Sequence, residues 1–153
     1  MKPLPTLSVA NWFVDKAKSE GQEITVMKLQ KLTYYAHGWC LKLFGQPLVD
    51  QYVQAWRWGP CFPDIYDAGG IYGSGPVTEE IPQPWNFWGE IFPDDNRIPL
   101  LEEVWRVYGG YTACQLARCV NREGGPWHVT IQNNPGRKNM NIDEQLIRDS
   151  LHE

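Results

Sequence analysis

Residues 27–72 read MKLQKLTYYAHGWCLKLFGQPLVDQYVQAWRWGPCFPDIYDAGGIY and decide the fold, because a long amphipathic helix runs there into a corner rich in aromatic residues, glycine and proline. Thr25 is placed to cap this helix, and Gly45 and Pro47 are placed to end it. The apolar positions follow helical spacing and predict a buried stripe of Met27, Leu29, Leu32, Ala36, Trp39, Cys40 and Leu43. The opposite face is expected to lie in solvent and carries Lys28, Lys31, Thr33, His37 and Lys42.

The corner begins where the helical pattern gives way to alternation. Residues 52–58, YVQAWRW, predict a short extended segment that Gly59 and Pro60 interrupt. Pro63 suits the first turn of a short helix, which the glycines at 69 and 70 end. We expect structural roles here, with Gly59 supplying an unusual backbone angle, the prolines setting the turn, and Trp56 and Tyr66 packing.

The remaining segments predict further helices. Helical spacing recurs in residues 8–19, 99–108, 112–122 and 141–151, with Thr112 and Asn141 as caps. Between the last two, NNPGRKN at 133–139 predicts a polar turn. We therefore predict a mainly α fold, a compact single domain over residues 1–153 with five to six helices and a short extended segment or small β-ribbon near residues 52–58.

Residues 74–99 contain closely spaced prolines, which predict a loop. This loop carries more apolar surface than a loop normally leaves in water, so it either folds back on the core or meets a partner. Since tryptophan is enriched at the centres of protein interfaces, the loop supplies a candidate partner interface. Its members are Trp85, Phe87, Trp88 and Phe92.

The composition narrows the classes of function. A net charge of -4 argues against neutralising nucleic-acid phosphates, so we expect no direct nucleic-acid binding. Residues 47–103 hold ten acidic residues and two arginines, so the middle third is the acidic one. There is no apolar run long enough to span a membrane, and the N-terminus MKPLPTLSVANWF has no signal-peptide pattern. We expect a cytoplasmic protein that does not bind membranes.

The chain lacks the common catalytic motifs, including GxGxxG, a Walker lysine, GxSxG and HExxH. Four cysteines at 40, 61, 114 and 119 have neither metal-pair nor disulfide-framework spacing, and we interpret them as reduced, mostly buried thiols. A small hydrolase or transferase would need Cys40, Cys61, His37 or His128 in a cleft. Binding is the favoured interpretation, with no catalytic residue, no cofactor and no metal site expected.

Four pieces of sequence together resemble the Panacea domain of SocA-like antitoxins, which also occurs in phage-associated proteins. They are MKLQKLTYYAHGWCLKLFGQPL, AWRWGPCFPDIYDA, VWRVYGGYTACQLA and GGPW, and the resemblance covers about residues 8–128. The family usually has Thr-His where this chain has Val120 and Asn121. The family motif marks Lys28, Gln30, Lys31, Tyr34, Trp39, Trp56, Gly59, Pro60, Pro63, Tyr66, Pro126 and Trp127 as scaffold or partner-contact residues. Among these, Gln30, Lys31 and Tyr34 are expected to be partly exposed.

The resemblance implies a small helical antitoxin that neutralises a cognate protein toxin by direct contact, the toxin gene lying next to its own. One family branch acts as an adaptor that delivers its toxin to a host protease, and a phage-encoded inhibitor of a host protein would use the same surfaces. The acidic segment suggests that the protein is steered toward a basic site on the toxin. These alternatives stay open at the level of sequence.

Overall fold

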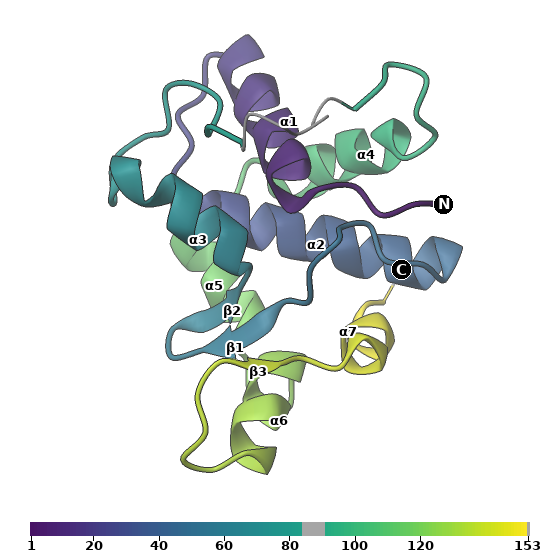
Figure 1. Cartoon of the computed structure of the whole chain (residues 1–153), viewed down its shortest axis with the longest axis vertical. Helices are drawn as coiled ribbons and strands as arrows, with labels where there is room; N and C mark the ends of the chain where they lie inside the picture. The colour runs from purple at the N-terminus through teal and green to yellow at the C-terminus, as the bar shows by residue number, and fades with distance from the viewer. Residues whose placement is uncertain (84–90, 153) are drawn as a thin grey trace.

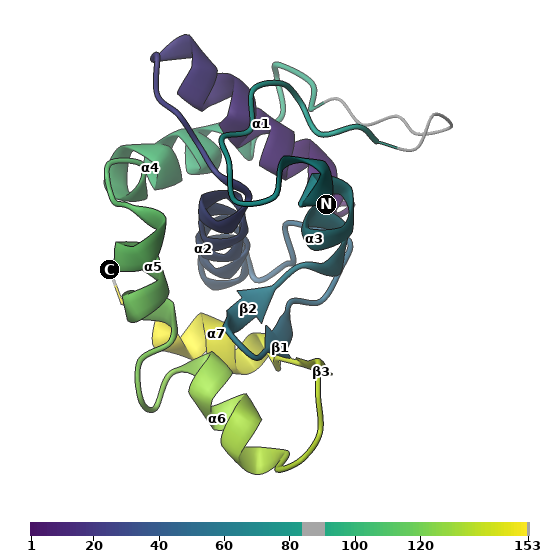
Figure 2. The ribbon, with the colours of Figure 1, turned by 90° about the vertical axis from the view of Figure 1, so that its left-hand side faces the viewer.

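The long helix predicted from residues 27–44 is the central element of the structure. The computed structural model describes residues 1–83 and 91–152, and Figure 2 looks down α2 (Val26–Phe44) with other elements all around it. The order within these residues is α1 (Thr6–Ser19), α2, β1 (Gln54–Trp56), β2 (Gly59–Cys61), α3 (Pro63–Gly69), the 3-10 turn η1 (Gly70–Tyr72), α4 (Ile98–Tyr108), α5 (Ala113–Val120), α6 (Pro126–Asn133), β3 (Met140–Asn141) and α7 (Glu144–Ser150).

The ends of α2 are where the sequence predicts them. The Thr25 hydroxyl accepts a hydrogen bond from the Lys28 N–H at 3.3 Å, and Gly45 ends the helix with φ +68°. Both positions use local chemistry that operates whatever the helix packs against. The predicted boundaries of this element are therefore confirmed.

The predicted solvent-exposed face of α2 is wrong. Lys28, Lys31, Thr33 and His37 are buried, whereas Met27 and Leu43 of the predicted stripe are exposed. The reason is the environment of the helix: α1, α3, α4, α5, α7 and β2 all pack against α2, so it is covered on nearly every side (Figures 1 and 2). A hydrophobic stripe marks one buried face and gives no information about polar side chains that find buried partners.

A small antiparallel sheet forms at the corner. β1 pairs with β2 in the register Gln54 to Cys61 and Trp56 to Gly59, and with β3 on its other side, so the strand order is β2-β1-β3. The predicted ribbon near residues 52–58 is confirmed. β3 comes from the segment after the predicted polar turn, and its two residues are too few to be recognised from their pattern.

The described part of the chain contains seven α-helices, against five to six predicted. The additional one is α6, which follows Gly125 with Pro126 in its first turn and is only eight residues long. The last helix, α7, is capped by Asp143, whose side chain accepts from the Gln145 N–H at 2.9 Å, rather than by Asn141. Short helices carry too few turns for their apolar spacing to be distinctive.

The proline-rich segment folds back on the core over its first part. The Asn11 amide group exchanges two hydrogen bonds with the Ile81 backbone, at 2.9 and 2.7 Å, and Val77 and Ile81 are buried. The Val77 N–H donates to the Ile24 carbonyl at 2.7 Å, beside the start of α2. The loop from residue 74 to 83 therefore stabilises the N-terminal end of the central helix.

Candidate partner-binding groove at the Trp-Gly-Pro corner

A groove of about 740 Å³ opens where the first turns of α2 meet the β1–β2 turn, α3 and η1. We call it the corner groove, and its lining includes Met27, Lys31, Trp58, Cys61 and Tyr66. Trp58 is 53% exposed and Tyr66 is 46% exposed, so large aromatic side chains form its rim. A second hollow between α1 and α4, lined by Lys16 and Glu102, contains none of the family-motif residues.

The aromatic rim is held in position from behind. Trp56 lies 4.8 Å from Tyr66 and 6.2 Å from Trp58 between ring centroids, and its indole N–H donates to Gln54 Oε1 at 2.9 Å. The Trp127 indole N–H donates to the Trp56 carbonyl at 2.6 Å. The motif residue Trp127 on α6 thus supports the hairpin rather than the groove surface, and Pro126 begins the helix that places it.

Gln30 fastens α2 to the far end of β2. Its Nε2 donates to the Phe62 carbonyl at 3.1 Å and to Cys61 Sγ at 3.3 Å, while its Oε1 accepts from the Phe62 N–H at 2.8 Å. Gln30 is buried, and so is Tyr34 one helical turn further on. The expectation of partial exposure at Gln30, Lys31 and Tyr34 is therefore wrong, because β2, α3 and α5 cover this face of α2.

Lys31 lines the corner groove, and its ammonium has few polar partners among the described residues. The residue is 2% exposed, and among the described residues Nζ donates only to the Pro60 carbonyl, at 3.5 Å. Among the residues that the structure describes, no carboxylate forms an ion pair with it. Burial lowers the pKa of Lys31 from 10.5 to about 8, with a smaller opposing effect from Cys61.

Because Gly59 has no side chain, the Lys31 ammonium and the Asn121 amide can both approach its backbone closely. Its φ of +133° is confined to glycine, as the sequence predicted, and a Cβ at this position would lie 2.9 Å from Lys31 Nζ and 2.6 Å from Asn121 Oδ1. The Asn121 Nδ2 donates to the Trp58 carbonyl at 3.1 Å, but its Oδ1 is buried and accepts no hydrogen bond from the described residues. Two poorly satisfied polar atoms therefore meet at one glycine.

Other motif residues have structural partners. Lys28 Nζ donates to the Gly109 carbonyl at 2.5 Å and lies 5.6 Å from the centre of the Trp105 ring. The Trp39 indole N–H donates to the Tyr108 hydroxyl at 3.0 Å. Pro63 begins α3, as predicted. These contacts attach α4 and α3 to the central helix.

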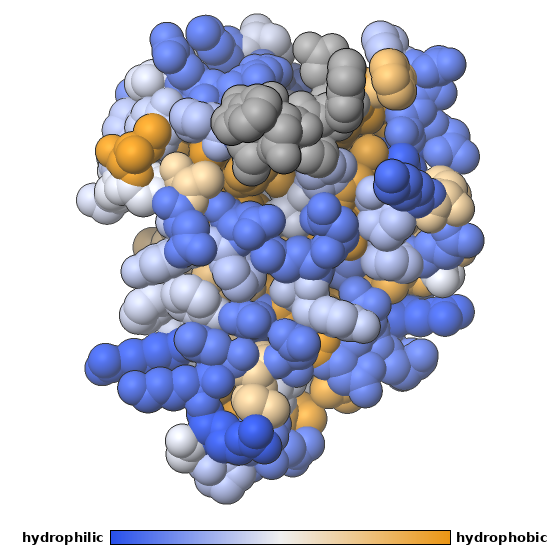
Figure 3. Space-filling view, viewed as in Figure 1, coloured by the Kyte–Doolittle hydropathy of each residue, from blue (hydrophilic) through white to orange (hydrophobic). Residues whose placement is uncertain are grey.

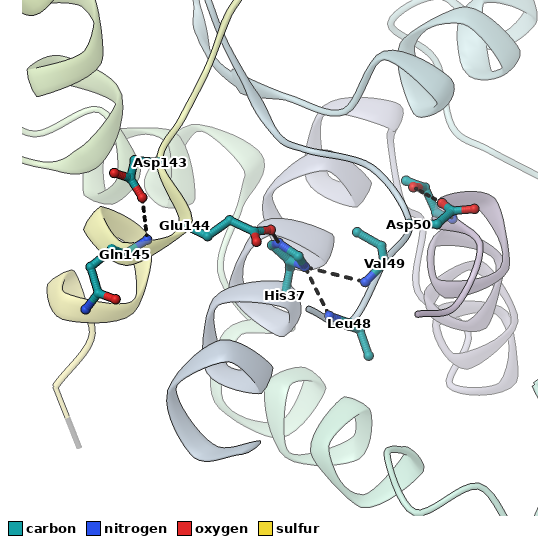
Figure 4. Close-up of polar contacts among 8 residues, drawn as sticks. His37, Leu48, Val49, Asp50, Asp143, Glu144 and Gln145 are labelled. Atoms are coloured by element: carbon teal, nitrogen blue, oxygen red, sulfur yellow. Dashed lines mark hydrogen bonds and ion pairs between the residues drawn. The ribbon is translucent and has the colours of Figure 1, made fainter. Parts of the chain in front are cut away.

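His37 is committed to a structural network, shown in Figure 4. Its Nδ1 accepts from the backbone N–H groups of Leu48 and Val49 at 3.3 and 3.5 Å, so the proton resides on Nε2, which donates to Glu144 Oε2 at 2.8 Å. One ring thereby joins α2, the turn after it and α7. The side chain is fully buried, which does not suit the base of a cleft enzyme.

The cysteine candidates differ in environment. Burial raises the pKa of Cys40 to about 11 and that of Cys61 to about 12, so both thiols stay protonated and poorly nucleophilic near neutral pH. Cys114 and Cys119 are exposed, so the prediction of mostly buried thiols holds for two of the four. His128 Nδ1 accepts from the Gly124 N–H at 3.1 Å. Over the described ranges, no three potential ligands form a metal-binding group.

The predicted interface in the proline-rich loop is only partly described. Phe92 is exposed, whereas Trp85, Phe87 and Trp88 lie outside the described residues. The face in Figure 3 is largely hydrophilic, with hydrophobic surface at its left edge over η1. No helix in the part of the chain that the structure describes is both long and apolar enough to cross a membrane.

The sequence pattern did not single out two residues that the structure places here. Trp58 belongs to the quoted corner, and its alternation with Trp56 along residues 52–58 was the available signal. Asn121 was noted only as a departure from the family pattern, and its position beside Gly59 depends on how α5 docks on the hairpin.

Comparison with known proteins gives a consistent result. The family model described as Antitoxin SocA-like, Panacea domain, matches residues 29–128, which include most of α2, the hairpin and α5. Antitoxin SocA of Caulobacter vibrioides (strain NA1000 / CB15N) is 31% identical over 150 residues, covering 93% of this chain and 79% of that protein. No solved structure matches the chain.

Proposed function

The chain belongs to the SocA-like Panacea-domain family of antitoxins, and we propose that it neutralises a cognate protein toxin by binding it directly through the corner groove. The observation that carries the proposal is the exposed aromatic rim, with Trp58 and Tyr66 about half exposed beside a groove of about 740 Å³. Tryptophan and tyrosine supply much of the binding free energy at protein interfaces when a partner covers them.

The rim is suited to binding because it is already ordered. The Trp56 ring lies edge-on to Trp58 and tilted against Tyr66. Trp127 on α6 and Gln30 on α2 hold the two strands of the hairpin. A side chain held in one rotamer before association loses little conformational entropy when the partner arrives. The motif residues of the family thus support the groove, and the rim provides contact area.

We further propose that the toxin gene lies next to the gene for this chain and that the acidic middle third affects the rate of encounter. Residues 47–103 hold ten acidic residues and two arginines. A toxin with a basic surface would therefore associate more slowly as salt screens the attraction.

The test is coexpression of the chain with the adjacent open reading frame, scored by growth rescue and by copurification. Wild-type protein should restore growth and copurify with the toxin. Trp58→Ala combined with Tyr66→Ala should lose both, whereas Tyr52→Ala removes an exposed aromatic outside the corner groove and should lose neither. Circular dichroism checks that all variants are folded.

Full rescue by the folded Trp58→Ala, Tyr66→Ala variant would overturn the groove as the binding surface. Failure of the wild-type chain to rescue or copurify would overturn the antitoxin proposal itself. Rescue that disappears in a host lacking its cytoplasmic proteases would show delivery to a protease in place of direct inhibition.

A further inference from the structure

We infer that the corner groove receives an acidic residue of the toxin, whose carboxylate pairs with the Lys31 ammonium at the groove floor. This inference rests on the proposed function and names the chemistry of the contact. It starts from a charge that the fold buries without a counterion among the described residues: Lys31 is 2% exposed, and within them its ammonium donates one hydrogen bond, to the Pro60 carbonyl at 3.5 Å. Buried charges in proteins are normally paired, because the desolvation of an unpaired ion is unfavourable.

The same helix shows what a satisfied buried lysine looks like. Lys28, three residues earlier, donates to the Gly109 carbonyl at 2.5 Å and lies against the Trp105 ring. Lys31 has neither a short hydrogen bond nor an aromatic face in the described structure. Lys28 is 9% exposed and Lys31 is 2% exposed, so both are buried, and they also differ in their partners.

The Lys31 ammonium and the Asn121 amide occupy the position that a side chain at residue 59 would take. Gly59 has no side chain where a Cβ would come within 2.9 Å of Nζ, and the neighbouring Asn121 Oδ1 accepts no hydrogen bond from the described residues. An incoming acidic residue offers a carboxylate for the ammonium, and its backbone N–H is a donor of the kind that Asn121 Oδ1 lacks. An aspartate or glutamate thus has both a carboxylate to pair with Lys31 and a backbone N–H to donate to Asn121 Oδ1.

The electrostatics of the groove also favour an anion. Lys31 is the only cationic side chain among the described residues that line it, and the first residues of α2, including Val26 and Met27, line it as well. The N-terminus of a helix of this length carries partial positive charge that adds to that of Lys31. The one acidic residue of the lining, Asp67, is exposed on α3, so solvent screens its repulsion.

The aromatic and thioether rim specifies the surroundings of that carboxylate. Met27, Trp58 and Tyr66 would contact apolar residues on either side of the acidic one. Covering the rim excludes water from the ion pair, which strengthens the attraction between the two charges. The expected binding segment is therefore an aspartate or glutamate flanked by apolar side chains on the toxin.

The first test measures affinity for the cognate toxin with purified proteins by calorimetry. Lys31→Met should weaken binding by about 30-fold or more, as expected when one member of a buried charge pair is removed. Lys31→Gln retains a polar group without charge and should show a similar loss. Lys42→Met removes a lysine at the other end of α2 and should bind like wild type, and Asp67→Asn should bind equally well or more tightly.

The second test identifies the carboxylate. Carbodiimide joins an amine to a carboxylate only when the two are in contact, so treatment of the complex followed by mass spectrometry should link Lys31 to an aspartate or glutamate of the toxin. Converting that toxin residue to its amide should weaken binding to wild type and have little further effect on Lys31→Met.

The outcomes separate this inference from the proposed function. A complex that forms with unchanged affinity in folded Lys31→Met or Lys31→Gln would overturn the inference and leave the antitoxin proposal standing. A Lys31 link to an acidic residue of a second copy of this chain, with the mass of a dimer, would also overturn it. The absence of any complex with wild type would overturn the antitoxin proposal.

Discussion

The two lysines of the KLQKL motif in α2, Lys28 and Lys31, are both buried but have different partners. Lys28 contacts the end of α4, where its ammonium binds the Gly109 carbonyl at 2.5 Å and the Trp105 ring. Lys31 contacts the hairpin corner, where its ammonium has one carbonyl at 3.5 Å and no counterion among the described residues. Burial alone therefore does not show that a lysine has a structural role. We also ask whether its ammonium has hydrogen-bond partners or a counterion within the chain.

The position of Lys28 at the C-terminus of α4 stabilises that region. Gly109 is the C-cap of α4, and carbonyls at a helix C-terminus carry partial negative charge that a cation stabilises. At the hairpin corner, the Lys31 ammonium and Asn121 Oδ1 meet beside Gly59, and among the described residues the ammonium has one carbonyl at 3.5 Å while Asn121 Oδ1 accepts no hydrogen bond. We interpret the first region as part of the scaffold and the second as prepared for a partner.

The largest expected effect comes from adding a side chain at Gly59, where the Lys31 ammonium and the Asn121 amide leave no room for one. Gly59→Ala places a Cβ 2.6 Å from Asn121 Oδ1 on a backbone with φ +133°, so we expect a loss of about 3 kcal/mol in the free energy of unfolding. Urea unfolding of the toxin-free protein measures it. The matched control is Gly70→Ala, which has φ -58° and nothing within 4 Å of the new Cβ, and should change stability by about 0.5 kcal/mol or less.

Equal stability of Gly59→Ala and Gly70→Ala would show that the corner relaxes easily. The close approach of Lys31 and Asn121 to Gly59 would then not require a glycine at this position. Toxin affinity measured on the same two variants extends the comparison to binding.

A smaller change in the free energy of unfolding is expected to distinguish Lys28 from Lys31. Lys28→Met leaves the Gly109 carbonyl without its donor and should lower the free energy of unfolding by about 2 kcal/mol. Lys31→Met removes a buried charge that lacks a counterion, so it should be neutral or stabilising at pH 7. Chemical denaturation of both variants under one set of conditions is the measurement, and comparable destabilisation by the two would contradict the distinction.

The smallest effect is a pH dependence that belongs to Lys31. Burial lowers its pKa in the folded protein to about 8, whereas the unfolded chain keeps the ordinary value of 10.5. The unfolded state then binds the proton more tightly, so the contribution of Lys31 to stability rises with pH between these values. From pH 7 to pH 9 this amounts to about 1 kcal/mol.

The difference in unfolding free energy between wild type and Lys31→Met, measured at pH 7, 8 and 9, isolates this contribution from other titrating groups. The unfolding free energy of wild type should increase relative to that of Lys31→Met as the pH rises. If the unfolding free energies of wild type and Lys31→Met changed with pH in parallel, burial would not lower the pKa of Lys31 in the folded protein.

Much of the architecture was predictable from local chemistry. Thr25 and Gly45 bound α2, Thr112 caps α5, and Pro63 begins α3, because caps and prolines act through their own backbone neighbours. The ribbon at residues 54–61 follows from alternation broken by Gly59. The short helix α6 and strand β3 were missed, since neither is long enough to show a period.

The candidate site was less predictable. The sequence indicated that Gly59, Trp56 and Tyr66 form a corner, but the rim at Trp58 and the groove floor at Lys31 depend on the docking of α3 and α5 against α2. The predicted solvent face of α2 failed for the same reason. A lysine in a sequence gives no sign of whether a carbonyl elsewhere in the chain will reach it.

The sequence by itself determined the family, the mainly helical class, the limits of the central helix and the turn at Gly59, because each depends on residue identity and short-range spacing. Only the tertiary structure decided that this helix is covered on nearly every side, that His37 joins α2 to α7, and that Lys28 is bound while Lys31 is not. The physical reason is that burial and pairing of polar groups depend on segments distant in the chain, such as Gly109 and Asn121, whose approach no local pattern encodes.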